Sequence, residues 1–185
     1  KTFLINFNVL SAYHVIIFWF MNWFLKALPD MMILLAIYIK CLYPTWKNYE
    51  HNALVWHTFL YIYMCIILGW TIMPIFAHLL YAFDGVYENY NLLPFSDWIY
   101  GYGNYRRETL YNLMLFIPFG FIAQRTLRKP YRITLLYGAL FSFTIEISQL
   151  LFTSNRVCDI TDLINNTLGT LFGILLFILY DKCLK

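Results

Sequence analysis

The sequence predicts an all-α, polytopic transmembrane helical bundle of about five or six spans. Of the 185 residues, 61% are hydrophobic, 21% are aromatic and only 12% are charged, and the mean hydropathy is +0.60. A soluble globular domain carries roughly 25% charged residues, so this composition excludes a cytosolic enzyme and a disordered protein. The net charge of +3 is too small to indicate nucleic-acid binding. The lipid bilayer is therefore the predicted partner.

Intervals with few or no charges place the spans, because a charge at mid-bilayer is costly and a crossing helix needs about 20 apolar residues. They cover residues 9–25, 31–46, 53–83, 109–124, 133–152 and 163–180. The second interval is short and contains Lys40, so it is either a short span with a snorkelling lysine or a re-entrant segment. In the third, Pro74 is expected to kink or end the helix.

The distribution of cations predicts the orientation of these spans. Four of them crowd the short connection between the fourth and fifth spans: Arg125, Arg128, Lys129 and Arg132. This connection is predicted to be cytoplasmic, and alternation along the chain then places both termini in the cytoplasm. The connections 84–108 and 153–160 fall on the outer face, where the unusual polar residues gather.

Glu146 is the most informative single residue, because a carboxylate inside a span usually faces the protein interior or a wet cavity and marks a functional site. Gln149 lies three residues further on, on the same helical face and nearer the outer surface. The alternative interpretation is a structural polar pair that joins two helices.

A graded stripe runs down one face of the last span. Arg156, Asp159 and Asp162 are spaced by three residues, and Asn166, Gly169 and Gly173 continue at helical spacing. The two glycines predict a close approach of another helix. The two aspartates could also be ordinary acidic residues favoured by the N-terminus of a helix.

The acidic residues form a candidate cluster with the neighbouring amides as oxygen donors. Such a set could bind a hard cation or a polar headgroup, or Arg156 could neutralise it within an internal ion-pair network. The network is the simplest outcome, so we predict neither a metal nor a cofactor. The cysteines and histidines show no ligand or redox spacing.

The connection 153–160 is short, so the fifth and sixth spans are predicted to be antiparallel neighbours. This arrangement places Glu146 level with Asn166, and Asp162 near the level of Gln149. We therefore expect an outward-open polar pocket with Arg156 at its mouth.

A second group of residues lies before and within the fourth span. Asn112 is expected near the outer end of this span, where a buried amide needs partners. Pro118 frees a backbone carbonyl, and Gly120 leaves room beside it, which predicts a kinked helix that packs closely. The aromatic and glycine-rich stretch 98–105 suits an interfacial belt, or stacking on sugar rings.

Four blocks in this order resemble the VanZ-like family of bacterial integral membrane proteins. They are residues 91–95 (Asn-Leu-Leu-Pro-Phe), residues 112–120 (Asn-Leu-Met-Leu-Phe-Ile-Pro-Phe-Gly), Glu146 with Gln149, and residues 156–162 followed by Asn166-Thr-Leu-Gly169. The resemblance divides the chain into a VanZ-like transmembrane region, 84–185, and an N-terminal transmembrane region, 1–83, without an assigned motif. Carried over by motif, the candidate functional residues are Asn112, Glu146, Gln149, Arg156, Asp159, Asp162 and Asn166.

The resemblance implies a multi-pass protein of the bacterial cell membrane whose polar residues face the wall side. The type member of the family is associated with resistance to the glycopeptide antibiotic teicoplanin. This favours a protein whose pocket holds a lipid-linked envelope component or a glycopeptide. The alternatives are an intramembrane enzyme that uses carboxylates on a lipid headgroup, although no nucleophile is evident, and a small permease, although no internal repeat is evident.

Overall fold

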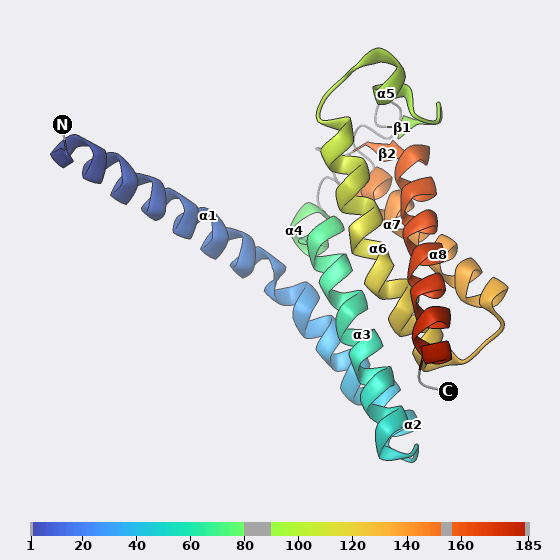
Figure 1. The fold of residues 1–185 in the computed structure, drawn as a ribbon. Helices are drawn as coiled ribbons and strands as arrows, with labels where there is room; N and C mark the ends of the chain where they lie inside the picture. The colour runs from blue at the N-terminus through green and yellow to red at the C-terminus, as the bar shows by residue number, and fades with distance from the viewer. Residues whose placement is uncertain (1, 80–89, 153–156, 184–185) are drawn as a thin grey trace.

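The computed structural model describes residues 2–79, 90–152 and 157–183, and for residues 2–17 it describes the helix only. The chain folds as an all-α bundle, as predicted (Figure 1). Its long helices are α1 (Thr2–Ile37), α3 (His51–Thr71), α6 (Tyr105–Leu127), α7 (Tyr131–Phe152) and α8 (Ile160–Cys183). Among the described residues, three stretches are long and apolar enough to cross a membrane: His51–His78, Tyr131–Phe152 and Ile160–Cys183. The chain is therefore a helical membrane protein.

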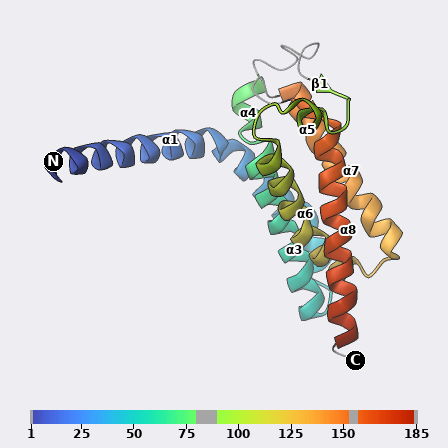
Figure 2. The same ribbon diagram turned by 45° about the horizontal axis from the view of Figure 1, so that its top comes forward.

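The N-terminal region differs from the two separate spans expected over 9–25 and 31–46. Helix α1 runs unbroken through the first interval and into the second, with Pro29 inside it, and is continued by the π-helical turn η1 (Tyr38–Leu42) and by α2 (Tyr43–Trp46). Figure 2 shows that its N-terminal half leaves the bundle, whereas its C-terminal half runs beside α3.

Asp30 lies between the two expected spans and inside the continuous helix α1. Asp30 is 8% exposed, and its carboxylate accepts a hydrogen bond from the backbone N–H of Phe76, with 3.2 Å between N and Oδ1. Phe76 lies at the start of α4 (Ile75–His78). A charge satisfied by another helix terminus can remain inside a continuous helix.

The remaining helices lie close to their predicted intervals. Helix α3 ends at Thr71, three residues before Pro74, and α4 follows the proline, as Pro74 predicts. Helix α6 continues through Pro118 and carries charged residues near both of its ends. Helices α7 and α8 extend the last two predicted intervals by a few residues.

The most extensive helix contact in the described structure joins α6 to α8, which run parallel. A Cβ added at Gly169 would lie 2.5 Å from the backbone oxygen of Leu113, and one at Gly173 would overlap the backbone oxygen of Ile117. A Cβ at Gly120 would overlap the backbone of α8. The three glycines therefore lie where two helix backbones touch, and only a hydrogen atom fits between them.

A core of apolar side chains joins α3, α6 and α7. The rings of Phe116 and Phe119 in α6 lie 5.9 and 5.4 Å from the ring of Phe141 in α7. Ile67 of α3 and Ile145 of α7 are buried in the same cluster. This core fixes the positions of the helix ends that carry the polar residues.

Small elements close one end of the bundle, in connections for which the sequence predicts no regular structure. Strands β1 (Tyr90–Asn91) and β2 (Cys158–Asp159) pair in parallel, with Asn91 opposite Asp159. Helix α5 (Ser96–Tyr100) lies beside them, at the end where α6 and α8 begin (Figure 1). The cationic connection between α6 and α7 lies at the opposite end of the bundle, near the C-terminus.

Candidate functional site

A cavity of about 600 Å³ lies at the end of the bundle that β1, β2 and α5 close, and we call it the polar cavity. This volume is typical of ligand-binding pockets. Its polar lining residues are Thr71, Asp97, Arg107, Glu108, Thr109, Asn112, Gln149, Asp159, Thr161 and Asp162. Its aromatic lining residues are Trp70, Phe95, Trp98, Tyr105 and Tyr111.

Four of the seven predicted polar residues line this cavity: Asn112, Gln149, Asp159 and Asp162. Asn112 comes from α6, Gln149 from α7, and the two aspartates from β2 and the first turn of α8. The Gln149 side chain is 4% exposed, and its Nε2 donates to the backbone oxygen of Thr71 at 3.1 Å. This bond ties the end of α7 to the end of α3.

Asp159 is held on both of its carboxylate oxygens. Nδ2 of Asn91 donates to Oδ2 at 3.0 Å, and the backbone N–H of Thr161 donates to Oδ1 with an N···O distance of 2.7 Å. The second bond is the usual N-cap interaction and stabilises the start of α8. Oδ1 of Asp159 therefore has the helix-capping role that the sequence left open for this residue. Oδ2 instead joins β2 to β1 through Asn91.

Glu146 lies behind Asp159 and is not among the residues that line the polar cavity. It is 3% exposed, and its Oε2 accepts a hydrogen bond from the backbone N–H of Asp159 at 2.9 Å. The contact joins α7 to the residue that caps α8. In this geometry Glu146 positions a wall of the cavity.

Asn166 lies deeper in the bundle than the pocket hypothesis expects. Its Nδ2 donates to Oγ of Ser142 at 2.9 Å, and Ser142 precedes Glu146 by four residues, or about 6 Å of helix. Asn166 therefore lies about one helical turn away from the level of Glu146, where the sequence places it. Asn166 contacts α7, whereas Gly169 and Gly173 contact α6.

Arg156 lies outside the described residues, so its predicted place at the pocket mouth stays a prediction. Asn166 is 3% exposed, and its Oδ1 has no hydrogen-bond partner in the described part of the chain. Within the ranges 2–79, 90–152 and 157–183, no group of three or more His, Cys, Asp or Glu side chains is arranged to hold a metal ion.

The pKa of the Cys158 thiol is affected by the negative charges at this end of the bundle. Burial raises the pKa of its thiol above the ordinary value, and the charges of Glu146, Asp159 and Asp162 raise it further. All three carboxylates are therefore close enough to Cys158 to act on it electrostatically.

Sequence reasoning missed the structural role of Asn91, although its block of residues carries part of the family resemblance. Oδ1 of Asn91 accepts a hydrogen bond from the backbone N–H of Leu93 at 3.2 Å, while Nδ2 binds Asp159. The backbone N–H of Phe95 donates to Oγ1 of Thr161 at 2.9 Å. Residues 91–95 thus pack against the start of α8. In the sequence, the only signal for this contact is the order of the block 91–95 and the block 156–162 within the family resemblance.

The candidate site also includes charged residues that the sequence did not single out. Asp97 lies in α5, and Arg107 and Glu108 lie in the first turns of α6. All three line the polar cavity. Their proximity to the start of α8 follows from the parallel packing of α6 against α8, which no local pattern reveals.

The chain is 29% identical over 122 residues to Protein VanZ of Enterococcus faecium. The aligned stretch covers 65% of this chain and 72% of that protein. No solved structure matches the chain at a significant level. The family model VanZ/LLP1 matches residues 32–181, a range that includes α3 as well as nearly all of the region 84–185. Because that match covers most of its length, the chain belongs to the VanZ/LLP1 family.

Proposed function

We propose that this protein is a multi-pass protein of the bacterial cell membrane whose polar cavity binds the sugar-bearing headgroup of a lipid-linked envelope component. The observation that carries the proposal is the composition of the cavity wall, where carboxylates and amides lie among aromatic rings. Hydroxyl groups of a sugar donate to carboxylate oxygens, and the apolar faces of sugar rings pack on aromatic side chains.

The charges of the wall favour this headgroup over a phosphate. Among the described residues that line the cavity, the acidic ones are Asp97, Glu108, Asp159 and Asp162, and the basic one is Arg107. A surplus of carboxylates repels an anion and favours a neutral or cationic group that donates hydrogen bonds.

Two aromatic residues at the cavity support the sugar-stacking alternative over a purely interfacial belt. The ring centroids of Trp98 and Tyr105 lie 4.8 Å apart, and both side chains line the cavity. The indole N–H of Trp98 donates to Oγ1 of Thr109 at 3.1 Å. This bond orients the indole ring at the cavity wall.

The proposed location of the cavity is the outer face of the membrane. The cations of the connection between α6 and α7 lie at the other end of the bundle, and the positive-inside rule assigns that end to the cytoplasm. Family membership adds a cellular role to the proposal: by holding its ligand at the outer face, the protein modulates susceptibility to teicoplanin-type glycopeptides.

Asp162→Asn tests the proposal, because it removes one charge from the cavity wall and keeps the size of the side chain. Asp181→Asn, at the other end of α8, is the matched control. We expect Asp162→Asn to weaken binding of a short, water-soluble glycan of N-acetylated amino sugars by about tenfold or more, the loss typical of a hydrogen bond to a charged group. In cells it should abolish any effect of the protein on the inhibitory concentration of teicoplanin.

The control variant should bind the glycan as the unmodified protein does. Equal binding by Asp162→Asn and Asp181→Asn would contradict a sugar site in the polar cavity. Cleavage or modification of the glycan during the measurement would instead support the intramembrane enzyme.

A further inference from the structure

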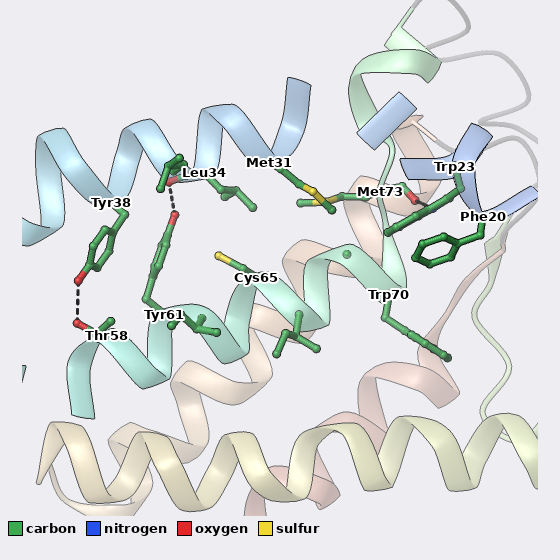
Figure 3. A pocket seen from close by; sticks show the side chains of 14 residues that line it. Phe20, Trp23, Met31, Leu34, Tyr38, Thr58, Tyr61, Cys65, Trp70 and Met73 are labelled. Carbon is green, nitrogen blue, oxygen red and sulfur yellow. Dashed lines mark hydrogen bonds between the residues drawn. The ribbon is translucent and has the colours of Figure 1, made fainter. Parts of the chain in front are cut away.

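A second hollow, with a volume of about 750 Å³, lies between α1 and α3. Figure 3 shows Met31 and Leu34 on the α1 side and Cys65 on the α3 side. Nearly all of its lining side chains are apolar, and we call it the apolar groove. It follows α3 from Thr58 to Trp70, about 18 Å of helix at 1.5 Å per residue.

The polar atoms of the groove walls bind each other across the two helices. The Tyr61 hydroxyl donates to the backbone oxygen of Leu34 at 2.7 Å, and the hydroxyls of Tyr38 and Thr58 lie 2.9 Å apart in a hydrogen bond (Figure 3). The indole N–H of Trp23 donates to a backbone carbonyl two residues beyond α3, with an N···O distance of 3.3 Å. These bonds hold the walls together, and the surface between them suits a hydrocarbon.

Gly69 keeps the groove open. A Cβ added there would meet only Sδ of Met73, at 4.0 Å. Glycine inside a helix is unfavourable relative to alanine, and at Gly120, Gly169 and Gly173 a close backbone explains it. Gly69 has no such neighbour, so its missing side chain leaves free volume in the groove.

Trp70 is a lining residue of both the apolar groove and the polar cavity. A molecule with its chain in the groove and its head in the cavity would therefore pass beside Trp70. Lipid tails are as apolar as the groove walls, so the groove alone does not distinguish one chain from another. Selectivity must come from the head that the adjoining cavity accepts.

We propose that the apolar groove binds the hydrocarbon chain of a sugar-headed lipid whose head lies in the polar cavity. This inference rests on the proposed function for the identity of the head, and it adds the site of the chain. The two sites then act as one, with the head selecting the molecule and the groove between α1 and α3 orienting it.

Photolabelling in phosphatidylcholine nanodiscs tests the inference. The probe is hexadecyl glucoside with a diazirine in the middle of its chain, and mass spectrometry locates the labelled residues. We expect labels on α1 and α3 at side chains that line the groove, such as Met31 and Cys65. Gly69→Phe fills the groove and should lower this labelling about fivefold or more. The control Val55→Phe adds a ring at an exposed position of α3 outside the groove and should leave the labelling unchanged.

The head is tested separately with Asp162→Asn, which should lower groove labelling by the glucoside probe and leave labelling by a headless hexadecane diazirine unchanged. Equal groove labelling by both probes in the unmodified protein would overturn the inference in favour of bulk lipid. Cross-links from the groove to a second copy of the chain, without probe adducts, would also overturn it.

Failure of this inference is distinguishable from failure of the proposed function. If Gly69→Phe keeps full labelling while Asp162→Asn loses glycan binding, the sugar site stands and the groove does not hold its chain. If Asp162→Asn affects neither glycan binding nor labelling, the proposed function fails and the coupling fails with it. Ile62→Trp, also in the groove wall, replaces Gly69→Phe if that variant does not fold, with the same expected loss.

Discussion

The buried carboxylate of Glu146 accepts a hydrogen bond from the backbone N–H of Asp159, with 2.9 Å between Oε2 and N. Glu146 lies in the last turns of α7 and Asp159 directly precedes α8, so the bond fixes the relative position of these helices at the polar cavity. Asp159 in turn caps α8 and binds Asn91. A single carboxylate in α7 therefore supports the cavity wall without lining it.

Glu146→Gln should lower the free energy of unfolding by about 1–2 kcal/mol, because a neutral acceptor replaces a charged one in a buried hydrogen bond. Thermal unfolding in detergent measures the change. Glu50→Gln makes the same chemical change at an exposed residue before α3 and should have no effect. A Glu146→Gln protein with unchanged stability and unchanged cellular effect would contradict both the structural role and the pocket.

Gly173→Ala should lower the free energy of unfolding by about 1–3 kcal/mol, because a Cβ there would overlap the backbone of α6 and push the two helices apart. Gly169→Leu should have at least the same effect, since its Cβ alone would lie 2.5 Å from the backbone oxygen of Leu113. Gly69→Ala is the control: with open space around it, this change should be neutral or stabilising by up to about 1 kcal/mol. Equal melting temperatures for Gly173→Ala and Gly69→Ala would show that the α6–α8 contact is looser than described.

The sequence predicts most of the helices well, because hydrophobic intervals and helical spacing are local properties. The spacing of Asp162, Asn166 and Gly169 places them near one face of α8. It does not say which neighbour that face meets, and the structure divides it between α7 at Asn166 and α6 at Gly169. Periodicity assigns faces, whereas tertiary packing assigns partners.

Axial level is the second property that spacing leaves open. The pairing of Asn166 with Ser142 rather than Glu146 depends on how α7 and α8 pack along their lengths. Likewise, the bond of Asn91 to Asp159 joins residues 68 positions apart, and no local signal encodes it. Asp30 lies inside the unbroken α1 and contacts α4, whereas an argument from charge alone treats its position as a break between two spans.

Cysteine accessibility tests the proposed orientation. Tyr102 is 65% exposed near the polar cavity, and Lys129 is exposed in the connection at the opposite end. In a variant without native cysteines, a thiol introduced by Tyr102→Cys should react with a membrane-impermeant maleimide in intact cells. One introduced by Lys129→Cys should react only after the cells are permeabilised. Labelling at residue 129 in intact cells would invert the proposed topology.

The alkylation of Cys158 tests whether the carboxylates around it are charged. Because burial and the neighbouring Glu146, Asp159 and Asp162 raise the pKa of its thiol, a smaller fraction is thiolate at neutral pH and the reaction is slow. In a variant with Cys158 as the sole cysteine, the alkylation rate should rise with pH along a profile whose midpoint lies above that of an ordinary thiol.

Glu146→Gln in this background should shift the midpoint of the profile to lower pH, since removing a negative charge favours the thiolate. Asp162→Asn should act in the same direction, and Glu50→Gln should leave the midpoint in place. The midpoint, unlike the absolute rate, does not depend on how easily the reagent reaches the half-buried thiol. An unchanged midpoint in both acidic variants would mean that neither Glu146 nor Asp162 is ionised beside Cys158, and Asp162 would then not belong to the surplus of negative charge that favours a sugar headgroup over a phosphate.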